Sequence, residues 1–263
     1  MRPNNSTVGV LLRQWRNYRR MSQLALALDG ELSARHLSFI ETGRSQPSRA
    51  LLLRLSERLD IPLRDRNELL LAAGYAPVFS NSSRDGATGG PAREAIELIL
   101  ASHEPFPALA VDSEWNLVQA NRAVGPLLAG VAAELLVPPI NVIRLSLHPN
   151  GLAHRIVNRA SWYRHIRHRL ARQMAVTHSS VLGALYDEIA GYAEMEPADP
   201  MPEIPFDGFV VPLQLRSPLG ELCFFSTTTL FGTPQDVLLD EIAIETFFPA
   251  DTLTRKRLQQ MAA

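Results

Sequence analysis

Four side chains that can contact the bases of DNA lie within five consecutive positions of the sequence. They are Arg35, His36, Ser38 and Phe39. An arginine can donate two hydrogen bonds to O6 and N7 of a guanine, which discriminates against other bases by about 1–3 kcal/mol. Such a cluster indicates sequence-dependent contact with a nucleic acid, provided that one element presents the four side chains to the same partner.

A short helix is the element that we expect to carry them. Leu37 and Ile40 are spaced i, i+3 and would point inward from a helix over residues 34–42, leaving the four side chains outside with Glu41. Ser33 is placed to cap the start of this helix, and a glycine follows its end. So narrow an inner face is typical of a helix that is presented to a partner.

A second short helix precedes it at the spacing of a helix-turn-helix motif. Ser22 is placed to cap a helix over residues 23–28, which Asp29-Gly30 ends. In this motif the second helix enters the major groove of DNA. DNA binding is therefore the first hypothesis for the N-terminal region.

Three further helices would complete an all-α bundle of five. Apolar residues recur at helical spacing over residues 8–20, 49–59 and 63–73. Residues 1–77 contain 12 Arg and no Lys against 7 Asp and Glu, a net charge of +5, whereas the remainder carries −6. A basic N-terminal region beside an acidic remainder favours nucleic-acid binding by the first region alone.

A polar stretch separates this bundle from the rest of the chain. SNSSRDGATGGP, residues 80–91, is rich in Ser and Gly and indicates a flexible linker. We therefore expect a helix-turn-helix DNA-binding domain at 1–77, a linker at 78–91 and a second domain at 92–263, so that the chain is multidomain.

The second domain combines strands and helices. Apolar patterns predict a β-hairpin from residues 106–111 and 115–120, and two more strands at 209–216 and 221–229. Helices are predicted at 92–102, 122–128, 152–175, 179–193 and near the C-terminal end, with a surface loop at 195–207. This order predicts an α+β fold with a mixed antiparallel sheet, helices on one of its faces and a cavity between the two layers.

The N-terminal region resembles the xenobiotic-response-element type of helix-turn-helix, the family that includes phage repressors. The resemblance rests on SQLALAL, SARHLSFIETGR and PSRALLLRLSERLDIP, and covers roughly residues 8–75. Carried over by position, it implies that Ala34, Arg35, Ser38 and Phe39 face the bases. Phe39 departs from the polar residue common at this place, and would press on a thymine methyl group or pack on the partner helix.

The same resemblance makes Gln23, Arg44 and the backbone amides near Ser22 candidates for phosphate contacts, which set the register but carry no sequence information. The full set of residues expected at DNA is Gln23, Ser33, Ala34, Arg35, His36, Ser38, Phe39 and Arg44. The alternative is that the charged members form only the solvated face of a structural helix.

The remainder of the chain resembles the sensor domain of the MmyB-like transcription regulators. The stretches WNLVQAN, NVIRLSLHPNGL, SWYRHIRHRL and CFFSTTTLFGTPQDVLLDEIAIETFFPAD carry this resemblance, and residues 112–121 also look like the opening of a PAS domain. The resemblance implies a PAS-like fold that holds a small apolar ligand such as a fatty acid, a homodimer, and a link to antibiotic or secondary metabolism.

A fatty acid needs an apolar tunnel and a cation or hydroxyl group for its carboxylate. Arg144, His148, Arg164 and His165 are candidate partners of that carboxylate, and Trp162 and Tyr163 could line the tunnel. The expected ligand-binding residues are Arg144, His148, Trp162, Tyr163, His165 and Phe224. The alternative is that the aromatic residues belong to the core and the basic ones are solvated or paired with carboxylates.

Other kinds of site lack the residues that their chemistry needs. A self-cleaving repressor needs a serine and a buried lysine, but the single lysine, Lys256, lies in a polar run. His165 and His168 share a predicted helix, while His148, His154 and His178 lie elsewhere. No Asp or Glu occurs between Glu134 and Asp187, and nearby arginines would repel a cation. We therefore expect no enzyme, no metal and no cofactor apart from the ligand.

The location and partners follow from what the sequence lacks. A single cysteine, Cys223, fits a reducing compartment, and its neighbours LCFFS predict a buried, inert thiol. We find no apolar run of about 18 residues, so we expect a cytoplasmic protein without a membrane partner. The Arg- and His-rich helix over 154–172 could form a second anionic-partner surface, but Trp162, Ile166 and Leu170 give it an ordinary inward face.

The sequence thus predicts a ligand-responsive transcription factor that binds a double-stranded DNA operator as a homodimer. The alternative is a constitutive DNA-binding protein whose second domain serves only dimerisation or recruitment of another protein.

Overall fold

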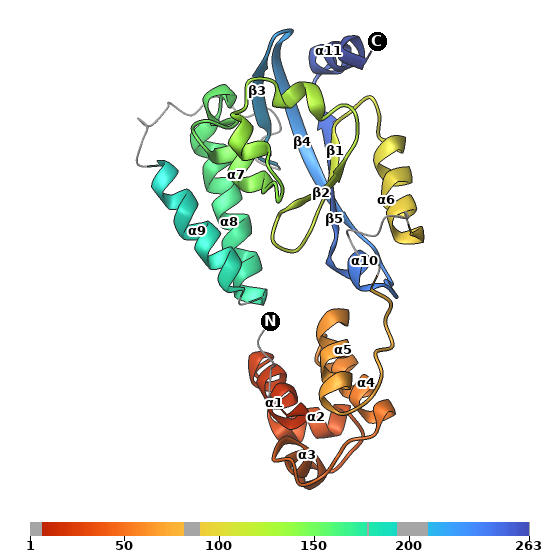
Figure 1. Ribbon diagram of the computed structural model, residues 1–263. Helices are drawn as coiled ribbons and strands as arrows, with labels where there is room; N and C mark the ends of the chain where they lie inside the picture. The colour runs from red at the N-terminus through yellow and green to blue at the C-terminus, as the bar shows by residue number, and fades with distance from the viewer. Residues whose placement is uncertain (1–6, 82–89, 178, 194–209, 263) are drawn as a thin grey trace. The chain divides into compact units, whose positions relative to one another are not determined.

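A computed structural model describes residues 7–81, 90–177, 179–193 and 210–262 of the chain, which divides into two compact units (Figure 1). The first unit comprises residues 1–83 together with 232–240, and the second comprises 84–231 and 241–263. In the described ranges, every helix is too short or too polar to cross a membrane. Most of the predicted linker, the predicted loop at 195–207, His178 and the predicted strand start at Phe209 lie outside the described residues.

The first unit contains the five predicted helices. They are α1 (Val8–Tyr18), α2 (Gln23–Asp29), α3 (Ala34–Glu41), α4 (Arg49–Arg58) and α5 (Leu63–Ala72). Ser22, Ser33 and Ser48 each accept a hydrogen bond from the backbone N–H three residues later, at 3.0, 3.1 and 3.3 Å. The predicted caps of α2 and α3 are therefore confirmed, and Ser48 caps α4 in the same way.

Helix α3 is held by a small apolar face and by a close backbone contact. Leu37 and Ile40 are fully buried against Leu12 of α1 and Leu26 of α2. A Cβ atom added to Gly9 of α1 would come within 2.2 Å of the Ile40 carbonyl oxygen. The two helices can approach so closely because position 9 carries no side chain.

A buried ion pair also joins α1 to α3. Arg16 donates from Nε to Glu41 Oε1 at 2.6 Å and from Nη2 to Oε2 at 2.9 Å, and Gln23 Nε2 donates to the same carboxylate at 2.8 Å. Arg16 is 8% exposed and Glu41 is 5% exposed. The expectation that Glu41 lies outside is therefore wrong, because the guanidinium of α1 compensates the charge that its burial would otherwise leave unpaired.

A five-stranded antiparallel sheet forms the centre of the second unit. Its strands are β1 (Ala108–Val111), β2 (Leu117–Ala120), β3 (Leu213–Ser217), β4 (Gly220–Leu230) and β5 (Ala243–Pro249), in the order β2-β1-β5-β4-β3. β1 and β2 form the predicted hairpin, and β4 pairs with β5 along seven positions from Phe224–Pro249 to Leu230–Ala243. With its helices, the sheet makes the α+β, PAS-like domain that the sequence predicted.

Helices lie on both faces of the sheet, whereas the order of elements predicted one face. Helices α7 (Val142–Leu147), α8 (Arg159–Thr177) and α9 (Ser180–Ala193) lie on one side, and α6 (Pro91–Ser102) lies on the other (Figure 1). Side chains of β5 agree with this. Arg169 of α8 contacts Glu245, whereas His103, at the end of α6, packs on Phe248 three positions later and so on the opposite face.

The segment between β2 and α8 differs most from the prediction. The helix expected at 122–128 is a 3₁₀ turn, Gly125–Leu128, and the helix expected at 152–175 begins at Arg159. Residues just before Arg159 are instead bound to β3: Ile156 bridges to Leu215, and the Asn158 amide donates to the Pro212 carbonyl at 2.7 Å. These pairings with a distant strand override the local helical pattern.

The space between the sheet and helices α7 to α9 is packed with apolar side chains. Trp162, Ile166 and Leu170 form the predicted inward face of α8. They belong to one cluster with Phe224 of β4 and Leu258 of α11 (Thr252–Ala262), the closing helix. The helices are thereby fixed against the sheet by burial of large apolar groups.

The buried ion pair generates a test of stability. Glu41→Ala leaves Arg16 buried without its partner, so we expect it to lower the free energy of unfolding by about 3–5 kcal/mol. Glu31→Ala removes the partner of Arg54 in a pair whose side chains are 42% and 76% exposed, and should cost less than about 1 kcal/mol. Urea denaturation followed by circular dichroism measures both, and equal losses would contradict the structural role of Glu41.

The same pair sets a pH dependence. Burial alone would raise the pKa of Glu41, but hydrogen bonds from Arg16 and Gln23 lower it below the ordinary value of 4.5. The stabilisation by Glu41 is therefore present above pH 4.5 and is lost as the pH falls through the lower pKa of the folded state. The stability difference between the unmodified chain and Glu41→Ala should shrink over this range, and an unchanged difference would show that the pair is not ionised.

Candidate nucleic-acid interface and ligand site

The residues predicted to contact DNA lie on the outer side of α3 and at the helix ends next to it. Ser33, Arg35, His36 and Arg44 are exposed. The remaining members of the predicted set are half-buried, namely Gln23, Ala34, Ser38 and Phe39. The structure therefore brings the set together on one surface of the first unit, which extends from the capped start of α3 to Arg44 beyond its end.

Phe39 forms the middle of this surface. The guanidinium carbon of Arg35 lies 5.4 Å from the centre of the Phe39 ring, and that of Arg44 lies 5.9 Å from it. Both distances are within the range of cation–π attraction. The ring thus orients two arginines that the sequence assigned to different tasks, base recognition and phosphate contact.

Two of the predicted residues have partners within the first unit. One Gln23 amide hydrogen is used by Glu41, and His36 Nε2 lies 3.4 Å from Ser45 Oγ. Gln23 lies at the start of α2, where a phosphate contact was predicted, and its amide nitrogen carries a second hydrogen that Glu41 does not use. Gln23 therefore links the buried ion pair to the surface that carries Arg35.

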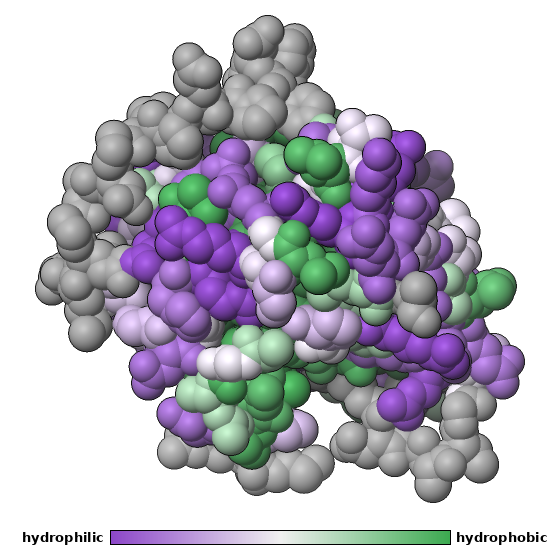
Figure 2. Space-filling model, turned by 90° about the horizontal axis from the view of Figure 1, so that it is seen from above, coloured by the Kyte–Doolittle hydropathy of each residue, from purple (hydrophilic) through white to green (hydrophobic). Residues whose placement is uncertain are grey.

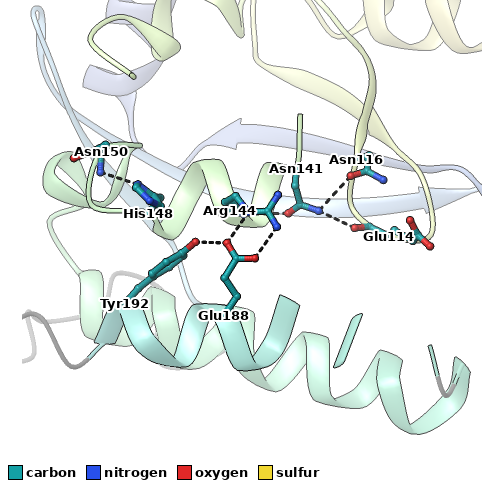
Figure 3. Close-up of polar contacts among 8 residues, drawn as sticks. All are labelled: Glu114, Asn116, Asn141, Arg144, His148, Asn150, Glu188 and Tyr192. Atoms are coloured by element: carbon teal, nitrogen blue, oxygen red, sulfur yellow. Dashed lines mark hydrogen bonds and ion pairs between the residues drawn. The ribbon is translucent and has the colours of Figure 1, made fainter. Parts of the chain in front are cut away.

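In the second unit, Arg144 is paired with Glu188 (Figure 3). Arg144 Nε and Nη2 donate to the two carboxylate oxygens of Glu188, each at 2.6 Å. The side chains are 38% and 35% exposed, so the pair lies at the edge of the domain and not in its core. Hydrogen bonding from Arg144 lowers the pKa of Glu188, which makes Glu188 an anion at neutral pH.

Asn141 and Tyr192 complete this cluster (Figure 3). The Asn141 side chain accepts from the Arg144 backbone N–H at 3.1 Å and so caps α7, while the Tyr192 hydroxyl donates to Glu188. Burial and the hydrogen bond to Glu188 raise the pKa of Tyr192 to about 12. The ring of His148 meets that of Tyr192 edge-on at 5.1 Å. Arg144 and His148, both predicted as candidate partners of a ligand carboxylate, therefore lie in one polar cluster.

Trp162, His165 and Phe224 lie between α8 and the sheet. Trp162 and Phe224 are buried, and the His165 ring stacks on Trp162 with 5.4 Å between ring centres. Burial, and next the charge of Arg169, lower the pKa of His165, so its ring is neutral at pH 7 and can only donate or accept a hydrogen bond. Tyr163 points toward α9, where its hydroxyl donates to the Ile189 carbonyl at 3.2 Å.

Arg169 is the cation that the sequence did not single out, although it faces the sheet. Its Nη1 donates to Glu245 Oε2 at 3.0 Å and its Nη2 to Thr228 Oγ1 at 2.6 Å, and its guanidinium carbon lies 4.5 Å from the centre of a Trp115 ring. Glu245 is 4% exposed. The signal in the sequence was a charged residue, Glu245, within a mostly apolar strand, because a buried charge requires a partner.

The face drawn in Figure 2 is mainly polar. In the view of Figure 2, hydrophilic side chains predominate and hydrophobic ones form separate patches. Exposed large apolar residues in the second unit, such as Leu98, Val137 and Leu253, come from different elements. The two clusters described above bring aromatic and charged groups together, as does Arg167 of α8, whose guanidinium carbon lies 4.4 Å from the centre of the Tyr186 ring.

Two protein families match the chain in the regions that carry these sites. Residues 12–65 match the helix-turn-helix family, and residues 92–261 match the family described as MmyB-like transcription regulator ligand binding domain. No curated protein matches the chain.

One solved structure aligned with the chain is described as an RNA-binding Light-Oxygen-Voltage receptor. The alignment covers 95% of this chain at 16% identity, and the chain spans 62% of the length of that protein. The TM-score of 0.26 is too low to assign a common fold.

The arrangement around Phe39 generates a test of base and phosphate contacts. The reference duplex is one selected from a random library for binding to the unmodified chain. Arg35→Ala should lower the affinity for this duplex about tenfold or more, so that it approaches the affinity for a duplex of scrambled sequence. Arg44→Ala should weaken binding to both duplexes by the same factor, because phosphates are common to all sequences. Fluorescence anisotropy measures both affinities.

Arg58→Ala, which removes an exposed arginine at the end of α4, is the matched control and should leave both affinities unchanged. If Arg44→Ala altered sequence preference while Arg35→Ala did not, the two roles would have to be exchanged.

Proposed function

The chain belongs to the MmyB-like transcription regulators, and from this premise we propose that a fatty acid bound by its second unit changes its affinity for operator DNA. The family matches already identify the chain as a DNA-binding transcription regulator with a ligand-binding domain. Two features support the proposed fatty acid ligand: an apolar cluster rich in aromatic side chains between the sheet and helices α7 to α9, and the arginine Arg144 at the edge of the same domain.

A homodimer is part of the proposal. One helix-turn-helix contacts few base pairs, so specific binding needs two copies on half-sites about 34 Å apart. The surface formed by Arg35, Ser38, Phe39 and Arg44 is small, and exposed Arg35 is the member best suited to reading a guanine. A change in the distance or angle between two such surfaces would then alter operator affinity without any change within either one.

The apolar part of a fatty acid suits the face of the sheet that α8 covers. Phe224 of β4 and Phe247 of β5 lie in the same apolar cluster as Trp115 and Trp162. Aromatic and aliphatic side chains of this kind favour an acyl chain over a polar ligand, because each buried methylene group gains about 0.8 kcal/mol. We therefore infer that the acyl chain lies among these residues.

We propose that the carboxylate of the ligand is bound by Arg144. The Arg144–Glu188 pair lies at the edge of the domain, where a charged head group can stay partly solvated. A carboxylate can take the place of Glu188 as the bidentate acceptor, since both groups have the same geometry. Binding would then release Glu188 and Tyr192 of α9, so that the ligand changes the contact between α7 and α9.

A titration tests the proposed function. The unmodified chain is incubated with palmitate, and its affinity for a duplex selected from a random library is measured by fluorescence anisotropy, with decanol as an uncharged control. We expect palmitate to change the dissociation constant about fivefold or more. An unchanged constant would favour the constitutive DNA-binding protein, as would native mass spectrometry that finds the purified full-length chain without ligand.

Two substitutions test the head-group site. Arg144→Ala should weaken palmitate binding about tenfold or more, because a hydrogen-bonded charge pair contributes about 1.5–3 kcal/mol. Glu188→Gln should strengthen it, because Arg144 is no longer neutralised by a neighbouring anion. Isothermal titration calorimetry measures both constants. Arg172→Ala removes an exposed arginine of α8 and is the control, and a loss of affinity as large as that of Arg144→Ala would place the head group elsewhere.

A further inference from the structure

The first unit includes nine residues that are distant in sequence from the rest of it. Residues 232–240, which we call the docking segment, connect β4 to β5 along the chain but belong to the compact unit formed by α1 to α5. We propose that this segment, through Asp240, positions α5 and couples the sheet of the sensor to the DNA-binding helices. The coupling part of this inference rests on the proposed function.

Asp240 supplies the N-cap that α5 lacks. One oxygen of its carboxylate accepts a hydrogen bond from the backbone N–H of Leu63, the first residue of α5, at 2.9 Å. Pro62, which precedes α5, makes no capping hydrogen bond with its own side chain. A carboxylate at a helix N-terminus satisfies a backbone donor and interacts favourably with the helix dipole. The start of α5 is therefore completed by a residue 177 positions later in the chain.

A second contact holds the docking segment one turn further along α5. Ser80 forms a parallel bridge with Asp236: Val237 N–H donates to the Ser80 carbonyl at 2.8 Å, and Ser80 Oγ donates to Asp236 Oδ2 at 2.7 Å. Residues just before Ser80 are bound to α5, because the Asn67 amide donates to the Phe79 carbonyl at 2.9 Å and accepts from the Phe79 N–H at 3.2 Å. The segment thus contacts α5 in two ways. Asp240 binds Leu63 directly, and Asp236 is connected to Asn67 through Ser80 and the neighbouring Phe79.

The docking segment is itself rigid at its centre. The other carboxylate oxygen of Asp236 accepts from the Leu238 N–H at 2.9 Å and so starts α10 (Val237–Glu241). Val237 is 1% exposed and Leu238 is 7% exposed. A short helix with two buried apolar side chains and two carboxylate contacts is a docked element and not a loose loop.

Strand pairing fixes the chain on both sides of the docking segment. Leu230, the last residue of β4, is paired with Ala243, the first residue of β5. The same two strands carry residues of the proposed ligand region. Glu245, which binds Arg169, lies on β5 two positions after Ala243. Phe224 of the apolar cluster lies on β4 six positions before Leu230. A shift of β4 or β5 that accompanies ligand binding is therefore carried into the segment through covalent bonds alone.

Helix α5 passes such a shift to the DNA-facing helix. Leu69 of α5 is buried in the same cluster as Leu37 of α3 and Leu12 of α1. Packed cores rearrange between discrete arrangements and do not deform continuously, so a new position of α5 changes the position of α3. The docking segment would be a second covalent connection between the two units, in addition to the predicted linker at 78–91. The effect of ligand binding on α3 would therefore not require that linker to be stiff.

The test compares the full-length chain with three variants. Asp240→Ala removes the capping carboxylate, Asp240→Asn keeps an oxygen that can accept from Leu63 N–H, and Glu68→Ala removes an exposed carboxylate from the same helix. Amide hydrogen exchange of residues 63–67 is measured first, without any ligand. We expect faster exchange in Asp240→Ala and unchanged exchange in the other two, and equal exchange in all four proteins would overturn the docking.

The second measurement is the change in duplex affinity on adding palmitate. We expect the unmodified chain, Asp240→Asn and Glu68→Ala to respond alike, and Asp240→Ala to lose the response while palmitate still binds in calorimetry. A full response in Asp240→Ala would overturn the coupling. If the unmodified chain binds palmitate and shows no response, the proposed function fails, and the exchange of residues 63–67 alone decides whether Asp240 positions α5.

Discussion

Helix α3, which the sequence predicts to face DNA, depends on one buried ion pair, Arg16–Glu41. Helix α3 has only Leu37 and Ile40 as fully buried apolar side chains, so burial of apolar surface contributes little to fixing its orientation. The ion pair joins the end of α3 to α1, and Gln23 brings the start of α2 to the same carboxylate. Directional hydrogen bonds therefore set the angle between the two helices of the motif, and the surface around Phe39 inherits its geometry from them.

Local patterns in the sequence predicted the elements whose contacts lie close along the chain. The serine caps of α2 and α3, the five helices of the first unit and the hairpin of β1 and β2 were all within reach of this approach, because each needs only a few neighbouring residues. The prediction that Glu41 is exposed was wrong because its partner, Arg16, lies 25 positions away in the sequence. The pairing of Arg169 with Glu245, 76 positions apart, was not predicted for the same reason. The late start of α8 has the same cause, since Asn158 and Ile156 pair with β3 more than 50 residues later.

In the second unit, arginines and carboxylates neutralise each other in two places. Arg144 with Glu188 lies at the edge of the domain, and Arg169 with Glu245 lies against the sheet. For the fatty acid that we propose, such a pair would make recognition competitive, because the ligand carboxylate would replace an internal carboxylate and not simply fill a vacant cation site. A neutral apolar molecule of the same length would gain nothing from that exchange. The link to antibiotic or secondary metabolism stays a prediction from the resemblance.

The discontinuity of the first unit has a consequence for biosynthesis. The ribosome completes α1 to α5 long before it reaches Asp236 and Asp240, which bind next to α5. At about 5–20 residues per second, the 160 residues between Ser80 and Asp240 take on the order of 10 s to synthesise. During that interval the nascent DNA-binding helices exist without the contacts that the docking segment provides. A fragment that ends at the linker would keep them permanently in this immature state, and the finished protein leaves it only after β1 to β4 of the sensor have been made, because Asp240 follows β4 in the chain.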